Sequence, residues 1–168
     1  MIGRLTGSVV DDDIDGNVIL DVGGVGYELL VPLGTIGRAR VRAEGLAVTL
    51  FVHTHVREDA IVLFGFASRD DRMAFRTLLG VSSIGPRTAL AILSMFGAAE
   101  LARAVQGRDV RALTQVPGVG KKSAERILLE LDGKLAFGSA QPTGAAPIAP
   151  GPVAAQVIEG LTRMGFKP

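Results

Sequence analysis

One pattern occurs twice in this chain: Val81-Ser82-Ser83-Ile84-Gly85-Pro86-Arg87-Thr88-Ala89 and, 35 residues later, Val116-Pro117-Gly118-Val119-Gly120-Lys121-Lys122-Ser123-Ala124. In each copy an apolar residue and a glycine lead into a basic residue, a hydroxyl side chain, an alanine and then an apolar run with helical spacing. Self-similarity of this kind indicates a duplicated supersecondary unit. We therefore expect two helix-hairpin-helix units in the middle of the chain.

The glycine-rich turn before each helix indicates phosphate binding. The first amide N–H groups of a helix lack intrahelical partners, and the helix dipole adds partial positive charge there. Glycine lets these groups approach a phosphate closely, and a neighbouring lysine or arginine adds charge attraction. Such contacts fix position on a nucleic-acid backbone without reading base edges. The candidate DNA-binding residues are Gly85, Arg87, Thr88, Gly118, Gly120, Lys121, Lys122, Ser123 and Arg126.

Two other phosphate-binding motifs are excluded by their spacing. A P-loop that ended in Lys122-Ser123 would need glycines at positions 121 and 116, which are Lys121 and Val116. The run Gly23-Gly24-Val25-Gly26 precedes alternating strand residues, whereas a dinucleotide fingerprint needs a third glycine that opens a helix. We therefore interpret Gly23-Gly24 as a turn and expect no cofactor.

Composition places the chain among folded, water-soluble proteins. Its 168 residues are 48% hydrophobic, which is enough to bury one core or two small ones. There are no cysteines, so disulfides and cysteine-ligated zinc are excluded. The start Met1-Ile2-Gly3-Arg4 lacks the apolar core of a signal peptide, and no apolar run approaches a membrane span. A cytoplasmic location is the expected default.

The net charge of +1 hides a difference between two parts of the chain. Residues 1–66 carry 5 Lys and Arg against 9 Asp and Glu, a net charge of −4, whereas residues 67–135 carry 11 against 7, a net charge of +4. The positive part contains the repeated pattern. Because basic segments gain affinity for phosphates through counterion release, charge and motif indicate the same function.

The first 66 residues have the pattern of strands. Turn residues at Asp11 to Asn17 and at Gly23-Gly24 separate stretches that are β-branched or alternate between apolar and polar residues, with one turn of helix expected near Thr35 to Val41. The predicted strands are Ile2–Val10, Val18–Val22, Gly26–Val31, Val48–His55 and Ile61–Phe66. Five strands suit a small barrel, and strand count alone leaves open an oligonucleotide/oligosaccharide-binding (OB) barrel or an SH3-like barrel.

From residue 67 the pattern becomes helical. Pro86 suits a first helical turn, Asp109 is an expected N-cap, and Gly97, Gly107 and Gly133 lie just past helical runs. The predicted helices are Arg69–Leu79, Pro86–Phe96, Ala98–Gln106, Val110–Thr114 and Lys121–Leu131. The fold class is therefore α+β multidomain, with a five-stranded barrel over residues 1–66 and an all-α domain over residues 67–137.

The rest of the chain has a different composition. Residues 138–152 are rich in Pro, Gly and Ala and almost uncharged, which predicts a flexible linker. Residues 153–168 contain one amphipathic helix, with Val153, Val157 and Leu161 on one face. A single helix of this size is marginal alone in water, so we expect it to begin a further domain that is incomplete here.

Four segments match the pattern of one family: Met1–Leu5, Val22–Glu28, Val56–Ala60 with Leu63–Phe66, and Pro117–Arg126. On these segments the chain resembles the RuvA family, the Holliday-junction-recognition subunits of bacterial RuvAB branch-migration complexes, over nearly its whole length. The resemblance implies an N-terminal OB barrel, a middle domain with two helix-hairpin-helix units, and a C-terminal domain that engages the RuvB ATPase.

The resemblance also implies the function and the partners. A family member binds four-way DNA junctions, holds them open and recruits RuvB for branch migration in homologous recombination, DNA repair and the SOS response to DNA damage. It is a non-catalytic, homotetrameric DNA-binding subunit, because ATP hydrolysis belongs to RuvB, and the RuvC resolvase is a further candidate partner. One tetramer and two tetramers facing each other across the DNA both fit the sequence.

Glu58 and Asp59 lie in the turn expected between the strand that ends at His55 and the strand that begins at Ile61. Polar residues in a hairpin turn are usually only solvated. By resemblance to the family, however, this pair is the acidic pin. Four such pairs at the centre of a tetramer would repel phosphates and discourage ordinary duplex, while the basic hairpins hold the four arms.

The chain departs from the family pattern in two places. The family usually has glycine where this chain has Ser83, so we expect the first hairpin turn to differ slightly or to be strained. In the family the third domain continues well beyond Met164-Gly165-Phe166, so we expect this chain to lack most of its RuvB-binding surface.

Two other functional classes stay open on the residues alone. Helix-hairpin-helix units also position DNA for nucleases and glycosylases, and an oligomeric protein scaffold would need no DNA affinity. No local signature joins a nucleophile to a base, so no catalytic residue is predicted. His53 and His55 share one strand face without a third ligand, which favours packing or surface roles over a metal site.

Overall fold

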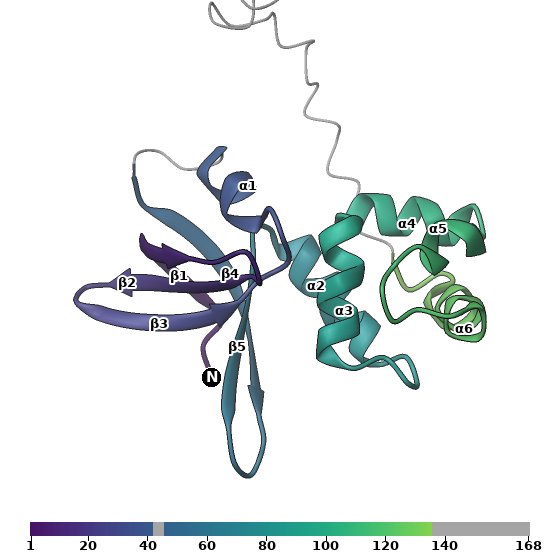
Figure 1. The fold of residues 1–168 in the computed structure, drawn as a ribbon, viewed down its shortest axis with the longest axis horizontal. Helices are drawn as coiled ribbons and strands as arrows, with labels where there is room; N and C mark the ends of the chain where they lie inside the picture. Colours follow the sequence, from purple (N-terminus) through teal and green to yellow (C-terminus); the bar gives the residue numbers. More distant parts are fainter. Residues whose placement is uncertain (42–45, 136–168) are drawn as a thin grey trace, which may run out of the picture. The chain divides into compact units, whose positions relative to one another are not determined.

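The computed structural model describes residues 1–41 and 46–135, so the expected linker at 138–152 and the helix after residue 153 lie outside the described residues. Five strands precede five of the six described helices (Figure 1). The strands are β1 (Arg4–Asp12), β2 (Asn17–Val22), β3 (Val25–Leu30), β4 (Val48–Val56) and β5 (Ile61–Phe66). The helices are α1 (Thr35–Val41), α2 (Arg69–Leu79), α3 (Pro86–Met95), α4 (Ala98–Gln106), α5 (Val110–Thr114) and α6 (Lys121–Leu131).

The strands close a barrel in the order β1-β2-β3-β5-β4. All neighbours are antiparallel except β3 and β5, which run parallel with Leu30 opposite Phe64. The helix α1 connects β3 to β4, where the sequence predicted only a turn of helix. This strand order, with a helix before β4, is that of an OB barrel and decides between the two barrels that strand count left open.

The first strand is displaced by two residues from the predicted range Ile2–Val10. It continues to Asp12, because a register shift between Val9 and Asp11 lets Asp11 and Asp12 pair with β2, and the predicted turn begins after them, where the N–H of Asp13 donates to the carbonyl of Asn17 at 3.0 Å. The second predicted turn is confirmed: Gly23 and Gly24 both have positive φ, 63° and 89°, and join the paired residues at the ends of β2 and β3.

Strand β5 connects the barrel to the helices by the alternation of its side chains. Leu63 belongs to the barrel core, whereas Phe64 and Phe66 belong to the core of the helices. Phe75 of α2 is fully buried between them, with its ring centroid 4.9 Å from each phenylalanine ring. The barrel and the helices therefore pack into one compact unit, Met1–Phe137.

Arg72 adds polar contacts across the same junction. Its Nη1 donates to the carbonyl of Gly3 at 2.7 Å and to that of Val52 at 3.4 Å, and its guanidinium lies 5.8 Å from the ring centroid of Phe51. The buried aromatic contact and these hydrogen bonds together fix the helices against β4 and β5.

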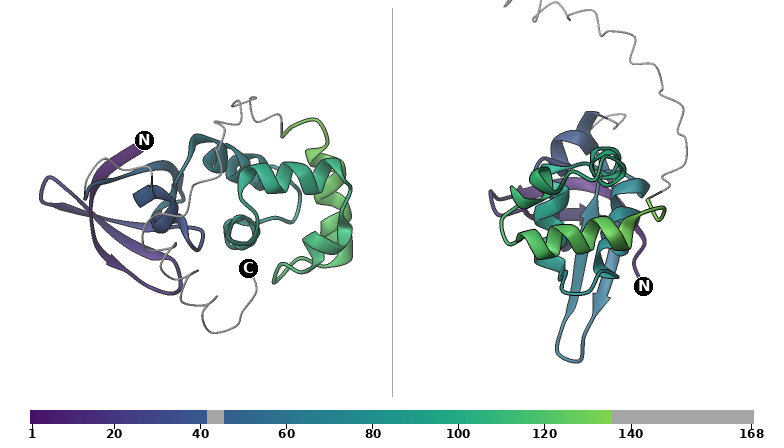
Figure 2. Two further views of the ribbon diagram at one scale, coloured as in Figure 1. Left: turned by 90° about the horizontal axis from the view of Figure 1, so that it is seen from above. Right: turned by 90° about the vertical axis from the view of Figure 1, so that its right-hand side faces the viewer.

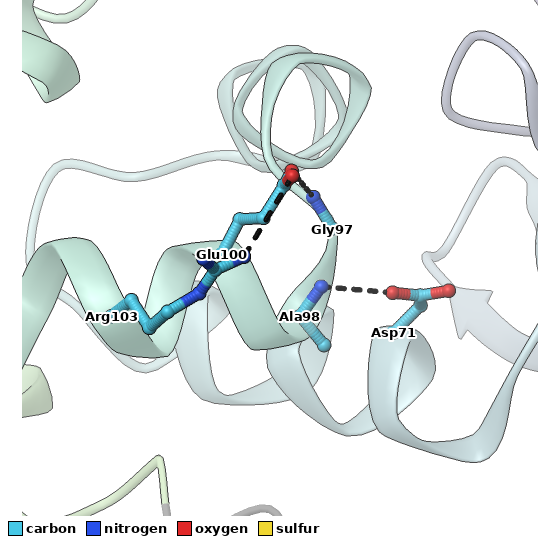
Figure 3. A network of polar contacts seen from close by, with 5 residues as sticks. All are labelled: Asp71, Gly97, Ala98, Glu100 and Arg103. Carbon is cyan, nitrogen blue, oxygen red and sulfur yellow. Dashed lines mark hydrogen bonds and ion pairs between the residues drawn. The ribbon is translucent and has the colours of Figure 1, made fainter. Parts of the chain in front are cut away.

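The helix ends follow the predicted signals, with one correction. Pro86 is in the first turn of α3, and the Asp109 side chain caps α5 by accepting from the N–H of Ala112 at 2.9 Å. The helix α3 ends at Met95, one residue before the predicted Phe96; Gly97 still lies just past it and is also the N-cap of α4. Figure 3 shows the Glu100 carboxylate accepting from the N–H of Gly97, at 3.1 Å.

In the part of the chain that the structure describes, no single helix is long and apolar enough to cross a membrane. The helices α3 and α4 would be long and apolar enough only if taken together, and they are bent by 91° from one another.

Candidate nucleic-acid interface

The two copies of the repeated pattern fold into the same backbone structure. In the first hairpin, the Val81 carbonyl accepts from the N–H of Ile84 at 3.1 Å; in the second, the Val116 carbonyl accepts from the N–H of Val119 at 3.0 Å. The glycine before each helix is extended at its N-cap, with φ of −91° at Gly85 and −83° at Gly120. The duplicated unit predicted from sequence is therefore confirmed in backbone geometry.

The turn of the first hairpin is not altered by its serine. Ser83 has φ 73° and the equivalent Gly118 has φ 83°, so both occupy the left-handed region. The left-handed conformation costs a non-glycine residue about 1–2 kcal/mol. Of the two alternatives expected for this turn, a slight difference or strain, the structure has the strained conformation.

Apolar residues hold each hairpin against the core and leave its polar residues outside. Val81 and Ile84 are buried in the first hairpin, as are Val116 and Val119 in the second. The candidate residues are exposed, except for the partly buried hydroxyl residues Thr88 and Ser123. The structure therefore places the sequence-predicted residues on the surfaces of two similar helix N-termini, at α3 and α6.

The two hairpins differ in charge. Lys121 and Lys122 begin α6, whereas the equivalent residues of α3 are Pro86, which has no N–H, and Arg87. Arg126 one turn later has Ala91 as its equivalent, and its Nε lies 3.9 Å from the Glu130 carboxylate. The second hairpin therefore offers more positive charge and one more amide donor to a phosphate than the first.

The predicted acidic pair lies at the end of an arm formed by β4 and β5. Figures 1 and 2 show this two-stranded arm extending past the barrel. The N–H of Arg57 donates to the carbonyl of Ala60 at 2.8 Å and closes the turn around Glu58 and Asp59. Both carboxylates are exposed, and neither forms an ion pair with another described residue. The arm thus presents two carboxylates that form no ion pair with another described residue, next to the exposed Arg57.

A groove of about 540 Å³ lies between this arm and the first hairpin. Arg57 and Asp59 border it from the arm, and Arg87 borders it from α3. Arg57 was not among the candidate residues; it lies 30 positions before Arg87, and only the fold brings the two to one groove. Its position directly before the acidic pair, inside a segment that matches the family, was the signal available.

The two histidines have packing roles in the structure. The His53 ring centroid lies 5.5 Å from that of Phe75, and the Nδ1 of His53 accepts from the Nε of Arg76 at 3.3 Å. Partial burial lowers the pKa of His53, and the positive charge of Arg76 lowers it further. Across residues 1–41 and 46–135 no group of three or more His, Asp or Glu residues is arranged to hold a metal ion.

The described fold and both hairpins have counterparts in known families. Residues 1–65 match the model of the RuvA N terminal domain, and residues 75–132 match that of the SAM-like helix-hairpin-helix tandem. The chain is 55% identical over 168 residues to the Holliday junction branch migration complex subunit RuvA of Solidesulfovibrio magneticus, covering 99% of this chain and 82% of that protein. The chain belongs to the RuvA family.

Other RuvA proteins are nearly as similar. The proteins of the same name from an Anaeromyxobacter species and from Chromobacterium violaceum are 48% and 46% identical to the chain over 169 and 168 residues. Both alignments cover at least 99% of this chain and 84% of the relative. The resemblance found from four sequence segments is therefore confirmed, as is the fold class of an OB barrel followed by a helix-hairpin-helix domain.

Proposed function

We propose that this protein binds four-way DNA junctions as a non-catalytic subunit of a branch migration complex. It holds the junction open and recruits the RuvB ATPase, in the bacterial cytoplasm. The relatives carry the name of a junction branch migration complex subunit, which supports the assignment. The observation that carries it is the combination of two basic hairpins with an exposed carboxylate pair at the end of a separate arm.

The basic hairpins supply attraction that does not depend on base sequence. The unpartnered N–H groups at the starts of α3 and α6 and the side chains of Arg87, Lys121, Lys122 and Arg126 would contact phosphates, with Thr88 and Ser123 as hydroxyl donors. The backbone could approach the DNA closely at Gly85, Gly118 and Gly120, because glycine has no side chain to hold the DNA away. No neighbouring atom lies where a Cβ would stand at these positions, so the surface there is open.

The arm supplies repulsion. Glu58 and Asp59 would lie where the four DNA arms meet and would raise the free energy of any complex that passes a continuous duplex across that point. A four-way junction has a central opening between its strands, so it avoids this repulsion while its arms keep the phosphate contacts. Selectivity for the junction follows from attraction at the hairpins combined with repulsion at the arm.

A tetramer would bring four arms together at the centre. The barrel supports assembly, because β1, β2 and β3 carry the exposed apolar side chains Val10, Ile19 and Val25. The proposed domains have boundaries after residues 66, 137 and 152. The proposed partners are RuvB and RuvC, and either one tetramer or two facing tetramers bind each junction.

The test is equilibrium binding to an immobile four-way junction and to a linear duplex of matched sequence and length, over a salt titration. We expect the junction to bind more tightly at every salt concentration. The double variant Glu58→Gln/Asp59→Asn should raise duplex affinity relative to junction affinity. Equal binding to both DNAs by the parent protein would contradict the proposal, as would metal-dependent cleavage of either DNA when Mg²⁺ is added.

A further inference from the structure

The groove between the arm and the first hairpin has an apolar floor. Val62 and Phe64 of β5, Leu30 of β3 and Leu90 of α3 contribute side chains to it. Its volume of about 540 Å³ falls within the roughly 300–1,000 Å³ typical of sites for single small ligands. A duplex arm is too wide for such a space, whereas one nucleotide with its base turned outward matches it in size.

Two arginines and one carboxylate border the groove. Arg57 and Arg87 are exposed, and neither forms an ion pair with a carboxylate within residues 1–41 and 46–135. The Nε of Arg57 donates to the Nε2 of His55 at 3.1 Å, which holds the guanidinium beside the groove. Asp59 is the one carboxylate among the lining residues. The groove as a whole therefore favours an anion, held away from Asp59.

We propose that this groove receives a single unpaired nucleotide from the strand crossover of a bound junction. Its phosphate lies against Arg87 at the start of α3, and its base lies over the apolar floor. The inference rests on the proposed function, because it assigns a ligand to a surface beside the acidic arm.

The chemistry of nucleic acids supports this occupant over a paired arm. A base inside a duplex is stacked on both faces and offers only its edges, whereas an unpaired base offers an apolar face that can be buried. Asp59 repels a phosphate from its end of the groove, which orients the nucleotide with its phosphate toward Arg87. The arm would thus both exclude duplex by charge and bind a base that leaves the duplex.

This proposal predicts that the groove adds to the preference for junctions with unpaired bases at the crossover. Unpairing a base costs free energy, and the cost is smallest where the base is already mismatched. A junction with one mismatched pair at the crossover of each arm should therefore bind more tightly than a fully paired junction. We expect a preference of about tenfold for the parent protein.

The experiment measures dissociation constants for these two junctions with the full chain and two variants. Ala60 lines the groove and is exposed, so Ala60→Leu fills it while the backbone hydrogen bond between residues 57 and 60 stays. Val56 is exposed on the same arm but does not line the groove, so Val56→Leu is the matched control. We expect Ala60→Leu to abolish the mismatch preference while its affinity for the paired junction stays within about threefold, and Val56→Leu to retain the preference.

A second readout follows the base itself, through the fluorescence of 2-aminopurine placed at the crossover. Its emission should rise on binding to the parent protein and less on binding to Ala60→Leu, because unstacking relieves quenching. A mismatch preference that Ala60→Leu leaves unchanged would overturn the nucleotide site but not the proposed function, since junctions would still bind better than duplex. Loss of selectivity between junction and duplex in the parent protein would overturn both.

Discussion

Ser83 and Gly118 occupy the same position in two hairpins that are 35 residues apart, and both are in the left-handed region of φ, at 73° and 83°. Serine disfavours this conformation by about 1–2 kcal/mol. The first hairpin adopts it nevertheless, because Val81 and Ile84 on either side of the turn are buried and the turn hydrogen bond forms between them. Packing of the flanking residues therefore determines the turn.

This relationship predicts the effect of exchanging the two residues. Gly118→Ser should lower the free energy of unfolding by about 1 kcal/mol, because it introduces the same backbone strain. A steric clash adds nothing to this cost, since a Cβ at residue 118 meets no neighbouring atom. Ser83→Gly should stay within about 0.5 kcal/mol of the parent, because relief of strain and the added entropy of the unfolded chain oppose each other. Urea unfolding measures both.

A glycine in ordinary helical conformation provides the control. Gly37 lies inside α1, has no positive φ, and a Cβ there also meets open space. Gly37→Ala should raise the free energy of unfolding by about 0.5–1 kcal/mol, the opposite sign from Gly118→Ser. A neutral effect of Gly118→Ser would show that the turn relaxes to another conformation.

Local patterns in the sequence were enough to predict most of the fold. Alternating residues gave the five strands, and capping signals such as Pro86 and Asp109 gave the helix starts. The errors have local causes: a bulge displaced β1, which ends at Asp12, and Phe96 became the C-cap of α3 instead of its last residue. The bulge has no signal in the sequence without its partner strand.

The candidate site was predictable only in part. The repeat identified both hairpins, and the family pattern identified Glu58 and Asp59. The groove was not predictable, because Arg57 and Arg87 border it from the arm and from α3, which only the tertiary packing brings together. Long-range contacts of this kind have no signal in a single sequence, since their residues follow different local patterns.

The unequal charge of the hairpins predicts unequal contributions to DNA binding. Lys121→Ala/Lys122→Ala removes two positive charges from the second hairpin, whereas Arg87→Ala removes one from the first. Each lost phosphate contact should reduce the slope of log affinity against log salt by about 0.9, so the double variant should reduce it about twice as much as Arg87→Ala. A junction-binding titration from low to moderate salt measures the slopes.

Arg111→Ala is the control for this prediction. Arg111 is an exposed arginine on α5, among the same helices but outside both hairpins. Its removal should leave the slope unchanged. A reduction by Arg111→Ala as large as that by Arg87→Ala would mean that the DNA responds to net charge and not to the hairpins.

The link between α2 and α4 predicts a specific loss of stability. The Asp71 carboxylate accepts from the N–H of Ala98 at 3.0 Å and from the Oγ of Ser68 at 2.8 Å, as Figure 3 shows for the first contact. Asp71→Ala leaves the N–H of buried Ala98 without its partner, and should lower the free energy of unfolding by about 1–3 kcal/mol.

Asp70 supplies a matched comparison for Asp71. Both residues lie in the first turn of α2, so either alanine substitution removes one favourable charge from the helix N-terminus. Asp70→Ala should cost no more than about 0.5–1 kcal/mol in the same urea titration. If the two variants were equally stable, the hydrogen bond to α4 would contribute nothing beyond the charge.

His53 predicts how stability depends on pH. Burial against Phe64 and Phe75, together with the charge of Arg76, lowers the pKa of His53 in the folded protein below its ordinary value of 6.5. The unfolded chain therefore binds a proton more readily than the folded one, so this histidine's contribution is fully present above pH 6.5 and is lost as the pH falls through the lowered pKa.

His53→Gln keeps an acceptor for Arg76 but cannot titrate. We expect the free energy of unfolding to fall more steeply on acidification in the parent than in His53→Gln, measured by urea unfolding at a series of pH values. Parallel pH profiles would show that His53 is equally protonated in both states.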